Sequence, residues 1–407
     1  MKTLRELYKI GKGPSSSHTM GPERACKYFK EKTKDATFYK AILYNSLART
    51  GKGHGTDKVI KQTLEPINTE VVFSYDTPKD VIHPNTMDLI AYKNDEEILR
   101  CRIESVGGGN IKIDGKLALS TPSMYPENSF AEINQFCKWR RLSLVEYVEM
   151  NEGVEIWDFL IDVWKVMKNS IKEGLENIGI LPGGLHVDRK AQILYKSINE
   201  EDTEEMKEIK LVSAYAFAVA EQNADNGTIV TAPTCGASGV VPAVLMYFQE
   251  KYKFDDRRIA EALAVGGLFG NLIRRNASIS GAECGCQAEI GTATSMAAAA
   301  ACELMGYSID ECEYAAEIAM EHSLGLTCDP IRGLVQIPCI ERNAVAATRA
   351  LDACHLSHIL VGTRNISFDM VVRTMYETGI NMNQAFRETS EGGLAKYYSR
   401  NRKDKQE

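Results

Sequence analysis

The chain has 407 residues, of which 44% are hydrophobic and 25% are charged, and its formal net charge at pH 7 is −7. This length is enough for two or more domains with sizeable cores, and the composition is that of a globular protein, which excludes a disordered chain. The negative net charge provides no basic field for a phosphate backbone, so we expect no nucleic-acid partner and chemistry on a small molecule.

The chain carries no pattern typical of export or membrane insertion. Lys2, Arg5 and Glu6 lie in the first eight residues without an apolar core behind them, unlike a secretory signal. The longest apolar stretch, residues 262–273, is interrupted by glycines and Asn271 and is too short to span a bilayer. We expect a cytoplasmic protein with no membrane partner, in which the eleven cysteines are reduced thiols.

Strand-like segments dominate the first third of the chain. Residues 39–47 and 70–75 are apolar runs, residues 87–92 and 98–103 flank a polar Lys93-Asn94-Asp95 turn, and residues 110–119 contain an Asp114-Gly115 turn signal. This pattern predicts antiparallel hairpins in an α+β domain, which we place at residues 1–135.

Beyond Pro126 the apolar period lengthens to that of helices. Ser143 and Glu146 form a capping box, and helices are predicted over residues 204–223, 242–252, 255–273, 293–305, 308–322, 341–361 and 367–377. Dense alanines at residues 297–301 allow helices to approach closely around a central one. We therefore expect an all-helical domain over residues 136–407, packed tightly against the first.

A hydroxyl-rich segment near the start combines five candidate residues, Ser15, Ser16, Ser17, His18 and Thr19, between Pro14 and Gly21. Hydroxyls and backbone amides at the start of a helix can bind a carboxylate, and an imidazole in the same turn can move a proton. The alternative is a serine-rich cap for a helix over residues 23–31.

A glycine-rich loop, residues 51–57, surrounds His54. It is not a phosphate loop, because Gly53 follows Lys52 where Ser or Thr is required, and Ser46 stands where a glycine is required. The glycines allow the backbone to approach a ligand closely around His54. A plain turn is the alternative.

Two smaller loops can be interpreted either as ligand-binding loops or as plain turns. The first contains His83, Asn85 and Thr86, and the second ends at Asn110. A third loop, residues 231–239, concentrates small residues around Cys235, which is also a candidate thiol ligand.

Cys286, Cys328 and Cys339 lie at predicted helix boundaries in the last third of the chain. The position of Cys339 at a helix N-terminus predicts a lowered thiol pKa. Three thiolates around an iron-sulfur cluster leave one iron open as a Lewis acid, whereas four ligands close it. A closed zinc or redox site completed by Cys235 or His322 is the alternative, and it would be non-catalytic. Cys302, Cys312 and Cys354, within alanine-rich helices, are expected to be small buried hydrophobes.

Taken together, these segments closely resemble the iron-sulfur-dependent L-serine dehydratases, also called L-serine ammonia-lyases. The resemblance is carried by residues 13–19, 51–57, 181–185, 278–283, 326–330 and 336–343. It implies a β-rich domain beside an all-helical domain, a homodimer, and a [4Fe-4S] cluster held by Cys286, Cys328 and Cys339 with the fourth iron left for substrate. It also implies that L-serine is converted to pyruvate and ammonia.

The expected chemistry assigns the remaining candidates. His54 is the expected base and His18 the alternative, while Ser15, Ser16, Ser17, Thr19, His83, Asn85, Thr86 and Asn110 are expected to contact substrate. A pyridoxal enzyme is disfavoured, since Lys12 and Lys52 lack a phosphate cradle. The sequence ends without the terminal cysteine that caps the free iron in a related group, so self-inhibition of that kind is not expected.

Overall fold

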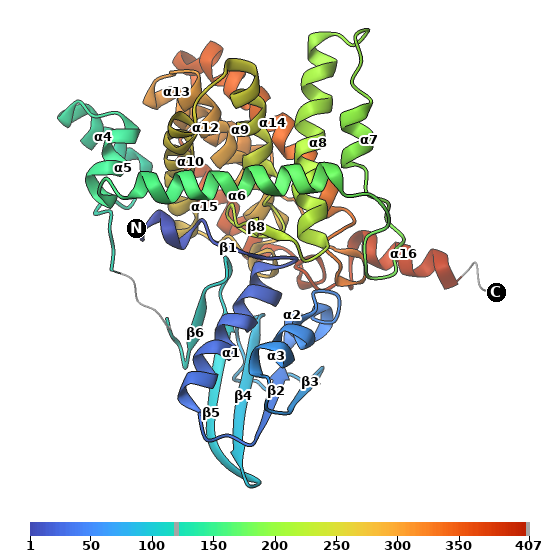
Figure 1. The fold of residues 1–407 in the computed structure, drawn as a ribbon. Coiled ribbons are helices and arrows are strands. Elements are labelled where there is room, and N and C mark those ends of the chain that lie inside the picture. The colour runs from blue at the N-terminus through green and yellow to red at the C-terminus, as the bar shows by residue number, and fades with distance from the viewer. Residues whose placement is uncertain (118–121, 404–407) are drawn as a thin grey trace.

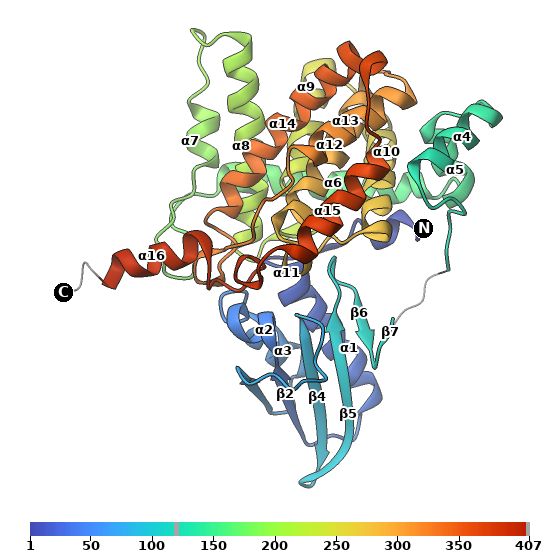
Figure 2. The same cartoon turned by 180° about the vertical axis from the view of Figure 1, so that it is seen from behind.

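The structure, a computed structural model, describes residues 1–117 and 122–403. It consists of an α/β body, formed by the N-terminal part of the chain, beneath a larger helical body (Figures 1 and 2). The predicted α+β and all-helical division of the fold is confirmed in this arrangement. No helix in the described ranges is long and apolar enough to cross a membrane.

The α/β body is built on a six-stranded sheet. Its strands are β2 (Phe38–Leu43), β3 (Thr69–Phe73), β4 (Thr86–Lys93), β5 (Glu96–Ser105), β6 (Ile111–Ile113) and β7 (Lys116–Leu117), in the order β3-β2-β4-β5-β6-β7. All neighbouring strands are antiparallel except β2 and β3, which are parallel. The predicted β4–β5 and β6–β7 hairpins are present, but residues 118 and 119 of the expected strand lie outside the described residues.

Local chemistry explains these turns. Asn94 and Asp95 have φ of 51° and 69°, and Asp114 and Gly115 have φ of 48° and 78°, conformations that these residue types tolerate well. The parallel β2–β3 pair requires a crossover, which is provided by α2 (Asn45–Thr50) and α3 (Thr56–Leu64). Helix α3 and α1 (Gly21–Lys32) cover one face of the sheet and share its apolar core (Figure 1).

The helical body surrounds a central buried helix. Its elements are α4 (Phe130–Arg140), α5 (Leu144–Glu152), α6 (Ile156–Glu176), α7 (Ala191–Lys196), α8 (Glu204–Ala224), α9 (Val240–Tyr252), α10 (Asp256–Asn276), α11 (Gly281–Cys284), α12 (Thr292–Leu304), α13 (Ile309–Glu321), α14 (Cys339–Leu360), α15 (Phe368–Asn381) and α16 (Gly393–Lys403). Helix α12 packs against α9, α10, α13 and α14. A Cβ at Gly266 of α10 would lie 2.6 Å from the carbonyl oxygen of Met296, so small residues permit this close approach.

The first twelve residues pack with the helical body although they precede the α/β body in sequence. Strand β1 (Ile10–Lys12) pairs antiparallel with β8 (Thr228–Val230). Leu4, Leu7 and Tyr8 are buried in the core of the helical body, and the Tyr8 hydroxyl donates to the carbonyl oxygen of Leu263 at 2.8 Å. The chain therefore crosses between the two bodies twice, once after β1 and once before α4.

Candidate functional site

The three predicted metal ligands converge on one narrow pocket. Cys286 lies between α11 and the single turn at Gln287–Gly291, Cys328 follows α13, and Cys339 is the first residue of α14. All three line the pocket, together with Pro14, Ser15, His54, Gly236, Glu289, Ile290, Pro330, Val335 and Glu388. Ligand atoms of Cys286, Glu289 and Cys328 lie within 4.8 Å of one another. The described residues thus bring together the cysteines that the sequence predicts.

Buried polar contacts hold the first two cysteine loops in place. The fully buried Gln287 donates to the carbonyl oxygens of Cys284 and Met375, and accepts from the backbone N–H of Gly325 at 2.9 Å. A Cβ at Gly281 would lie 3.1 Å from Cys328 Sγ and 2.7 Å from a Glu289 carboxylate oxygen. These loops are therefore fixed by hydrogen bonds, and no side chain larger than hydrogen fits at residue 281.

Arg342 is the cation that accompanies the cysteines. It donates to the carbonyl oxygen of Thr327 at 2.7 Å and forms an ion pair with Asp329 at 3.1 Å, both of which flank Cys328. A hydrogen bond with the Cys328 thiol and the charge of Arg342 lower the pKa of Cys286 to about 7, against the opposing effect of burial. A thiolate at Cys286 is thus stabilised near neutral pH.

The pKa predicted for Cys339 from its helix position is wrong in direction. Cys339 does begin α14, as predicted, but burial first and then the negative charge of Cys286 raise its pKa. The pKa of Cys328 is also raised, by its hydrogen bond to Cys286 and by burial. Without metal, burial limits the ionisation of thiols that lie this close together. Its effect on the pKa of Cys339 is larger than the lowering expected from the helix N-terminus.

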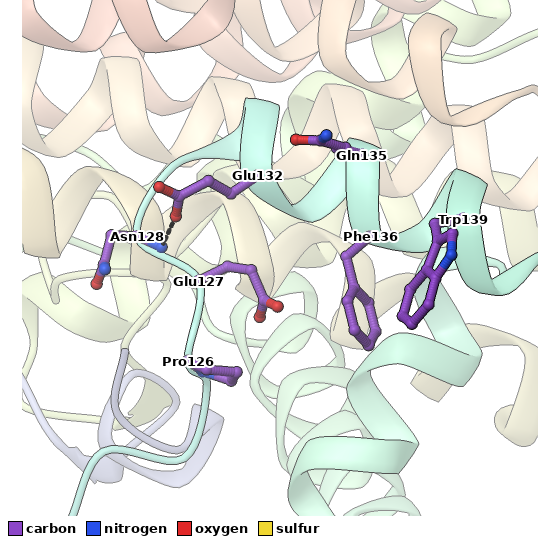
Figure 3. Close-up of a pocket in the computed structure, with 7 residues that line it drawn as sticks. All are labelled: Pro126, Glu127, Asn128, Glu132, Gln135, Phe136 and Trp139. Atoms are coloured by element: carbon purple, nitrogen blue, oxygen red, sulfur yellow. Dashed lines mark hydrogen bonds between the residues drawn. The ribbon is translucent and has the colours of Figure 1, made fainter.

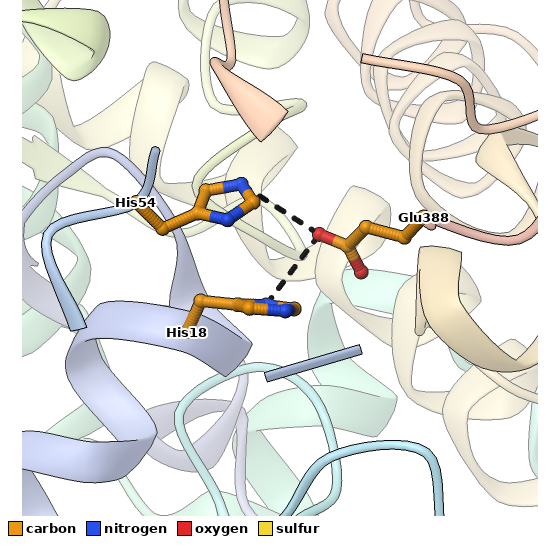
Figure 4. Close-up of side chains that lie close together, drawn as sticks. All are labelled: His18, His54 and Glu388. Atoms are coloured by element: carbon orange, nitrogen blue, oxygen red, sulfur yellow. Dashed lines mark ion pairs between the residues drawn. The ribbon is translucent and has the colours of Figure 1, made fainter. Parts of the chain in front are cut away.

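His18, His54 and Glu388 form a second buried cluster at the same pocket (Figure 4). Glu388 Oε1 lies 3.5 Å from His18 Nδ1 and 3.8 Å from His54 Nε2, and the two imidazole ring centres are 4.4 Å apart. The histidines come from the hydroxyl-rich and glycine-rich loops, and Glu388 comes from the segment before α16. Both predicted imidazoles therefore meet one carboxyl group.

Hydrogen bonding fixes the proton on His54. Its Nδ1 lies 3.1 Å from the carbonyl oxygen of Thr50, which can only accept, so Nδ1 carries the hydrogen. His54 Nε2 is then a lone-pair acceptor, and it is buried with no hydrogen-bond partner among the described residues. Burial lowers the pKa of His54 to about 4, so the imidazole is neutral near pH 7.

The tautomer of His18 follows from its hydroxyl neighbours. Its Nε2 lies 3.1 Å from Ser46 Oγ and 3.0 Å from Thr50 Oγ1. Both hydroxyls already donate to carbonyl oxygens, of Glu388 and Ser46 respectively, so Nε2 must donate to them. The lone pair of His18 is therefore on Nδ1 and faces Glu388, in an imidazole whose pKa is lowered by burial and then by His54.

Both imidazole lone pairs lie near one carboxyl oxygen, an arrangement that favours the protonated form of Glu388, and Ser17 Oγ also lies 2.9 Å from His18 Nδ1. Burial, followed by the charges of Glu289 and Cys286, raises the pKa of Glu388 well above its ordinary value. A protonated Glu388 between two neutral imidazoles satisfies this arrangement without net charge. The cluster can accept a proton at His54 Nε2 and hold another on Glu388.

Backbone contacts set the position of the two histidine loops. Thr19 Oγ1 donates to the carbonyl oxygen of His54 at 2.9 Å, and Thr56 Oγ1 donates to that of His18 at 2.6 Å. A Cβ at Gly53 would lie 2.6 Å from the carbonyl oxygen of Arg332. The close approach predicted for the glycine-rich loop is therefore an approach to the backbone of the helical body.

The structure places the other predicted substrate residues at different distances from the pocket. Ser15 lines it, and Ser16, Ser17 and Thr19 are buried in the same turn, where Ser17 Oγ lies 2.9 Å from His18 Nδ1. Asn110 instead accepts hydrogen bonds from Lys9 and Arg24, at 2.5 Å and 3.5 Å.

The loop at residues 83–86 also lies outside the lining of the cysteine pocket. Thr86 Oγ1 donates to the carbonyl oxygen of His83, and His83 Nδ1 accepts from the backbone N–H of Asn85. The side-chain amide of Asn85 is buried without a hydrogen-bond partner. These contacts are those of a plain turn for His83 and Thr86. The side-chain amide of Asn85 is left without a partner among the described residues.

Neither of the two candidate closing ligands lines the pocket of the three cysteines. Cys235 is buried 3.4 Å from Met20 Sδ and does not line the pocket. His322 is exposed, with Nδ1 3.0 Å from the carbonyl oxygen of Ile318. Glu289, in contrast, has a pKa raised to about 8 by burial and by the charge of Cys286.

Sequence reasoning missed the charged residues that complete the site, Glu289, Arg342 and Glu388. Arg342 lies three residues after Cys339 on the same helix, a spacing that places both on neighbouring helical turns and could have indicated it. Glu388 has φ of 57°, and it precedes Ser390, Gly392 and Gly393 in a turn-rich segment. Such a segment indicates a loop but not its partner in space.

A separate surface hollow of about 510 Å³ lies beside α4 (Figure 3). It is lined by Pro126, Glu127, Asn128, Glu132, Gln135, Phe136 and Trp139. These residues provide carboxylates and aromatic rings, whereas the smaller cysteine pocket provides thiols and an imidazole.

Comparison with known proteins accounts for nearly the whole chain. The serine dehydratase beta chain family matches residues 3–79, and the serine dehydratase alpha chain family matches residues 85–395. L-serine dehydratase TdcG of Escherichia coli is 40% identical over 96% of this chain and 98% of that protein. L-serine dehydratases of Streptomyces coelicolor and Helicobacter pylori are 38% and 36% identical, over 96% and 97% of this chain and 97% and 98% of those proteins.

Proposed function

Because the chain belongs to the serine dehydratase family, with both family regions in one polypeptide, we propose that it deaminates L-serine to pyruvate and ammonia at an iron-sulfur cluster. The observation that carries this proposal is the convergence of Cys286, Cys328 and Cys339 on the pocket that also contains His54 and Glu388. Thiols, an unpaired imidazole nitrogen and a buried carboxyl group meet in one place.

The residues of the pocket fit a [4Fe-4S] cluster by their donor chemistry. Cys286, Cys328 and Cys339 would hold it, since thiolates are the usual ligands of such clusters. Arg342, beside all three sulfurs, would offset the added negative charge. With only three thiolates bound, the cluster would supply an open iron that acts as a Lewis acid on the serine hydroxyl.

His54 is the proposed base for the α-proton of serine. Its Nε2 bears a lone pair, is not occupied by a hydrogen bond, and belongs to an imidazole that is neutral near pH 7. The Thr50 carbonyl oxygen, which accepts from Nδ1, stabilises the imidazolium that forms when Nε2 takes the proton. His18 is held by three hydroxyl groups, so we assign it a supporting role.

The other residues complete the proton balance. Removal of the α-proton and loss of the β-hydroxyl as water leave 2-aminoacrylate, which tautomerises to an imine and is hydrolysed to pyruvate and ammonia. The proton on Glu388 lies between both imidazoles, and Glu388 can return it as the hydroxyl departs. Burial of Glu388, His18 and His54 excludes bulk water and strengthens these contacts.

Substrate contacts are proposed for the hydroxyl-rich turn at the pocket. Ser15 faces the pocket, while Ser16, Ser17 and Thr19 shape the same turn. Asn85 retains an unpaired amide, whereas His83, Thr86 and Asn110 are bound to other protein groups. We place the substrate carboxylate at Ser15 and its neighbours.

A closed, non-catalytic site is the alternative, and Glu289 favours it. Its carboxylate lies within 4.8 Å of the sulfurs of Cys286 and Cys328, close enough to act as a fourth ligand to zinc or iron. Metal content and substrate turnover distinguish the two functions.

The decisive experiment is anaerobic purification followed by iron and sulfide analysis and an assay with L-serine, D-serine, L-threonine and L-cysteine. We expect about four irons and four sulfides per chain, from the cluster proposed above, and pyruvate formation from L-serine. Zinc in place of iron, or iron without pyruvate formation, would contradict the proposal. We further propose that the protein acts as a cytoplasmic homodimer, with domains at residues 1–135 and 136–407, which gel filtration and limited proteolysis would test.

A further inference from the structure

Three buried side chains beside the three cysteines have the atom types of a second metal site. His18, His54 and Glu388 each place one ligand atom within 4.8 Å of the others. The three side chains come from segments far apart in sequence, and they are 0%, 1% and 6% exposed (Figure 4). Two imidazoles and one carboxylate form a donor set that binds zinc and other divalent transition metals.

Both histidines have the tautomer that such a site requires. His54 Nδ1 donates to the carbonyl oxygen of Thr50, which leaves the lone pair on Nε2. His18 Nε2 donates to the hydroxyls of Ser46 and Thr50, which leaves the lone pair on Nδ1. Outer hydrogen bonds of this kind fix the tautomer and ring orientation of metal-binding histidines. Neither imidazole therefore has to change its tautomer to bind a metal ion.

The distances between the ligand atoms are close to those around a tetrahedral ion. Glu388 Oε1 lies 3.5 Å from His18 Nδ1 and 3.8 Å from His54 Nε2. Ligands at about 2.0 to 2.1 Å from a tetrahedral zinc ion lie about 3.3 to 3.4 Å from one another. Only small side-chain shifts are needed, and the fourth position stays open. Because His54 and Glu388 line the cysteine pocket, an ion can enter from it.

The unpaired nitrogen of His54 is the independent observation that points to a ligand. His54 Nε2 is buried and has no hydrogen-bond partner among the described residues. A cation bound at this nitrogen satisfies a buried acceptor that is otherwise left unpaired. The negative charges of Glu289 and Cys286, which act on Glu388, also favour a cation at this place.

One existing contact opposes metal binding. Ser17 Oγ lies 2.9 Å from His18 Nδ1 and donates to its lone pair. A serine hydroxyl can rotate, and Ser15 Oγ, 3.3 Å from Ser17 Oγ, is an alternative partner. The cost of metal binding at His18 is therefore the exchange of one hydrogen bond for another.

We propose that His18, His54 and Glu388 bind a zinc ion, and that this ion inhibits the enzyme reversibly. The metal site depends on the geometry alone, whereas the inhibition rests on the function proposed above. Zinc at His54 Nε2 occupies the lone pair that would accept the α-proton of serine. Zinc at Glu388 takes the place of the proton held on that carboxyl group. Both groups are blocked until the ion is removed.

Zinc binding is measured by equilibrium dialysis of the anaerobically purified protein, followed by elemental analysis. We expect the parent to take up about one added zinc per chain. His18→Gln and Glu388→Gln, each of which removes one ligand, should weaken binding about tenfold or more, since even the loss of an outer partner of a metal ligand costs that much. His355→Gln, at an exposed position on α14, is the matched control and should bind zinc as the parent does.

X-ray absorption at the zinc edge identifies the ligands of the added ion. Nitrogen and oxygen neighbours at about 2.0 to 2.1 Å are expected, without sulfur at about 2.3 Å. Added zinc with sulfur neighbours only would place the ion at the cysteines and overturn the inference. Absence of zinc binding in the parent, or equal affinity of the parent and both ligand variants, would overturn it too. If His18→Gln melts early, Glu388→Gln decides.

The inhibition is tested on the same material. Zinc should stop pyruvate formation from L-serine at the concentrations that fill the site, and a chelator should restore it with the iron content unchanged. A filled site without inhibition, or inhibition that follows loss of iron, would overturn the inhibitory role. If the parent forms no pyruvate without zinc, the function proposed above fails, while the dialysis and absorption measurements still decide the metal site.

Discussion

The protein contains two groups of three buried cysteines that differ in what surrounds them. Cys302, Cys312 and Cys354 come from α12, α13 and α14, and Cys302 Sγ lies 3.3 Å from Cys354 Sγ in the core of the helical body. Cys286, Cys328 and Cys339 lie instead at helix ends around a pocket. Close thiols alone therefore do not define a site.

The two groups of cysteines differ in the charged residues around them and in the pocket that reaches the sulfur atoms of one group. Arg342, Glu289 and Glu388 surround the pocket cysteines, and a pocket reaches their sulfurs. The core cysteines have Ser357 and helix backbone as polar neighbours, and the charges that act on their thiols are the carboxylates of Glu303 and Glu311. The pocket group can exchange protons and bind a ligand, while the core group packs as small apolar side chains.

Replacing one cysteine in each group gives the largest expected contrast. Cys328→Ser should abolish pyruvate formation from L-serine and bleach the brown chromophore of the proposed cluster, because one of its three proposed ligands is lost. Cys302→Ser should retain both, since Ser357 Oγ at 3.6 Å can pair with the new hydroxyl. Iron analysis, visible absorbance and pyruvate assays measure the difference. Equal loss in the two variants would point to misfolding and remove the distinction.

His54→Ala should separate cluster binding from catalysis. We expect turnover to fall by about 10² to 10⁴-fold, the usual contribution of a general base, with iron content and melting temperature close to those of the parent. The measurement is kcat for L-serine on material with matched iron content. Near-normal turnover would remove His54 as the base and leave His18 as the candidate.

Glu388→Gln should have a smaller effect than His54→Ala. Glutamine preserves the shape and can still donate a hydrogen bond, but it cannot transfer a proton. We expect kcat to fall by about 10 to 100-fold with little change in KM. Gln384→Glu, at the exposed start of the same loop, is the control, because it also changes the number of carboxylates in this loop. A change in KM alone would assign Glu388 to substrate binding.

The smallest expected effect is the response of activity to pH. An imidazole acts as a base only when neutral, and the pKa of His54 is lowered from 6.5 to about 4. Activity should therefore persist as pH falls from 7.5 to 5.5, and it should decline only as pH approaches 4. The pH profile of kcat/KM tests this. A decline centred near 6.5 would show that the base is an exposed, ordinary histidine.

Sequence reasoning succeeded where the signals are local. The β4–β5 turn at Asn94 and Asp95, the capping box of Ser143 and Glu146 on α5, and the helix boundaries at the cysteines each follow from residues a few positions apart. These features depend on backbone preferences and capping, which a single segment expresses by itself.

Features that depend on contacts between distant segments were not predictable. Glu388 reaches the histidines through a loop whose backbone bonds to Cys328 and Ser46. The pKa of Cys339 depends on burial and on Cys286, neither of which its helix position reveals. The sequence indicates that Asn110 is a polar loop residue, yet its side chain accepts a hydrogen bond from Lys9, which directly precedes β1. In each case the partner is set by tertiary packing.

The double crossing of the chain between the two bodies has a mechanical consequence. A unit attached by one strand of polypeptide can twist freely, but the α/β body is attached both after β1 and before α4. Two connections oppose the free rotation that a single connection would permit. His18 and His54 come from the α/β body and all three thiols come from the helical body, so the packing between the bodies sets the distance between these groups, while the helical body alone sets the spacing of the thiols.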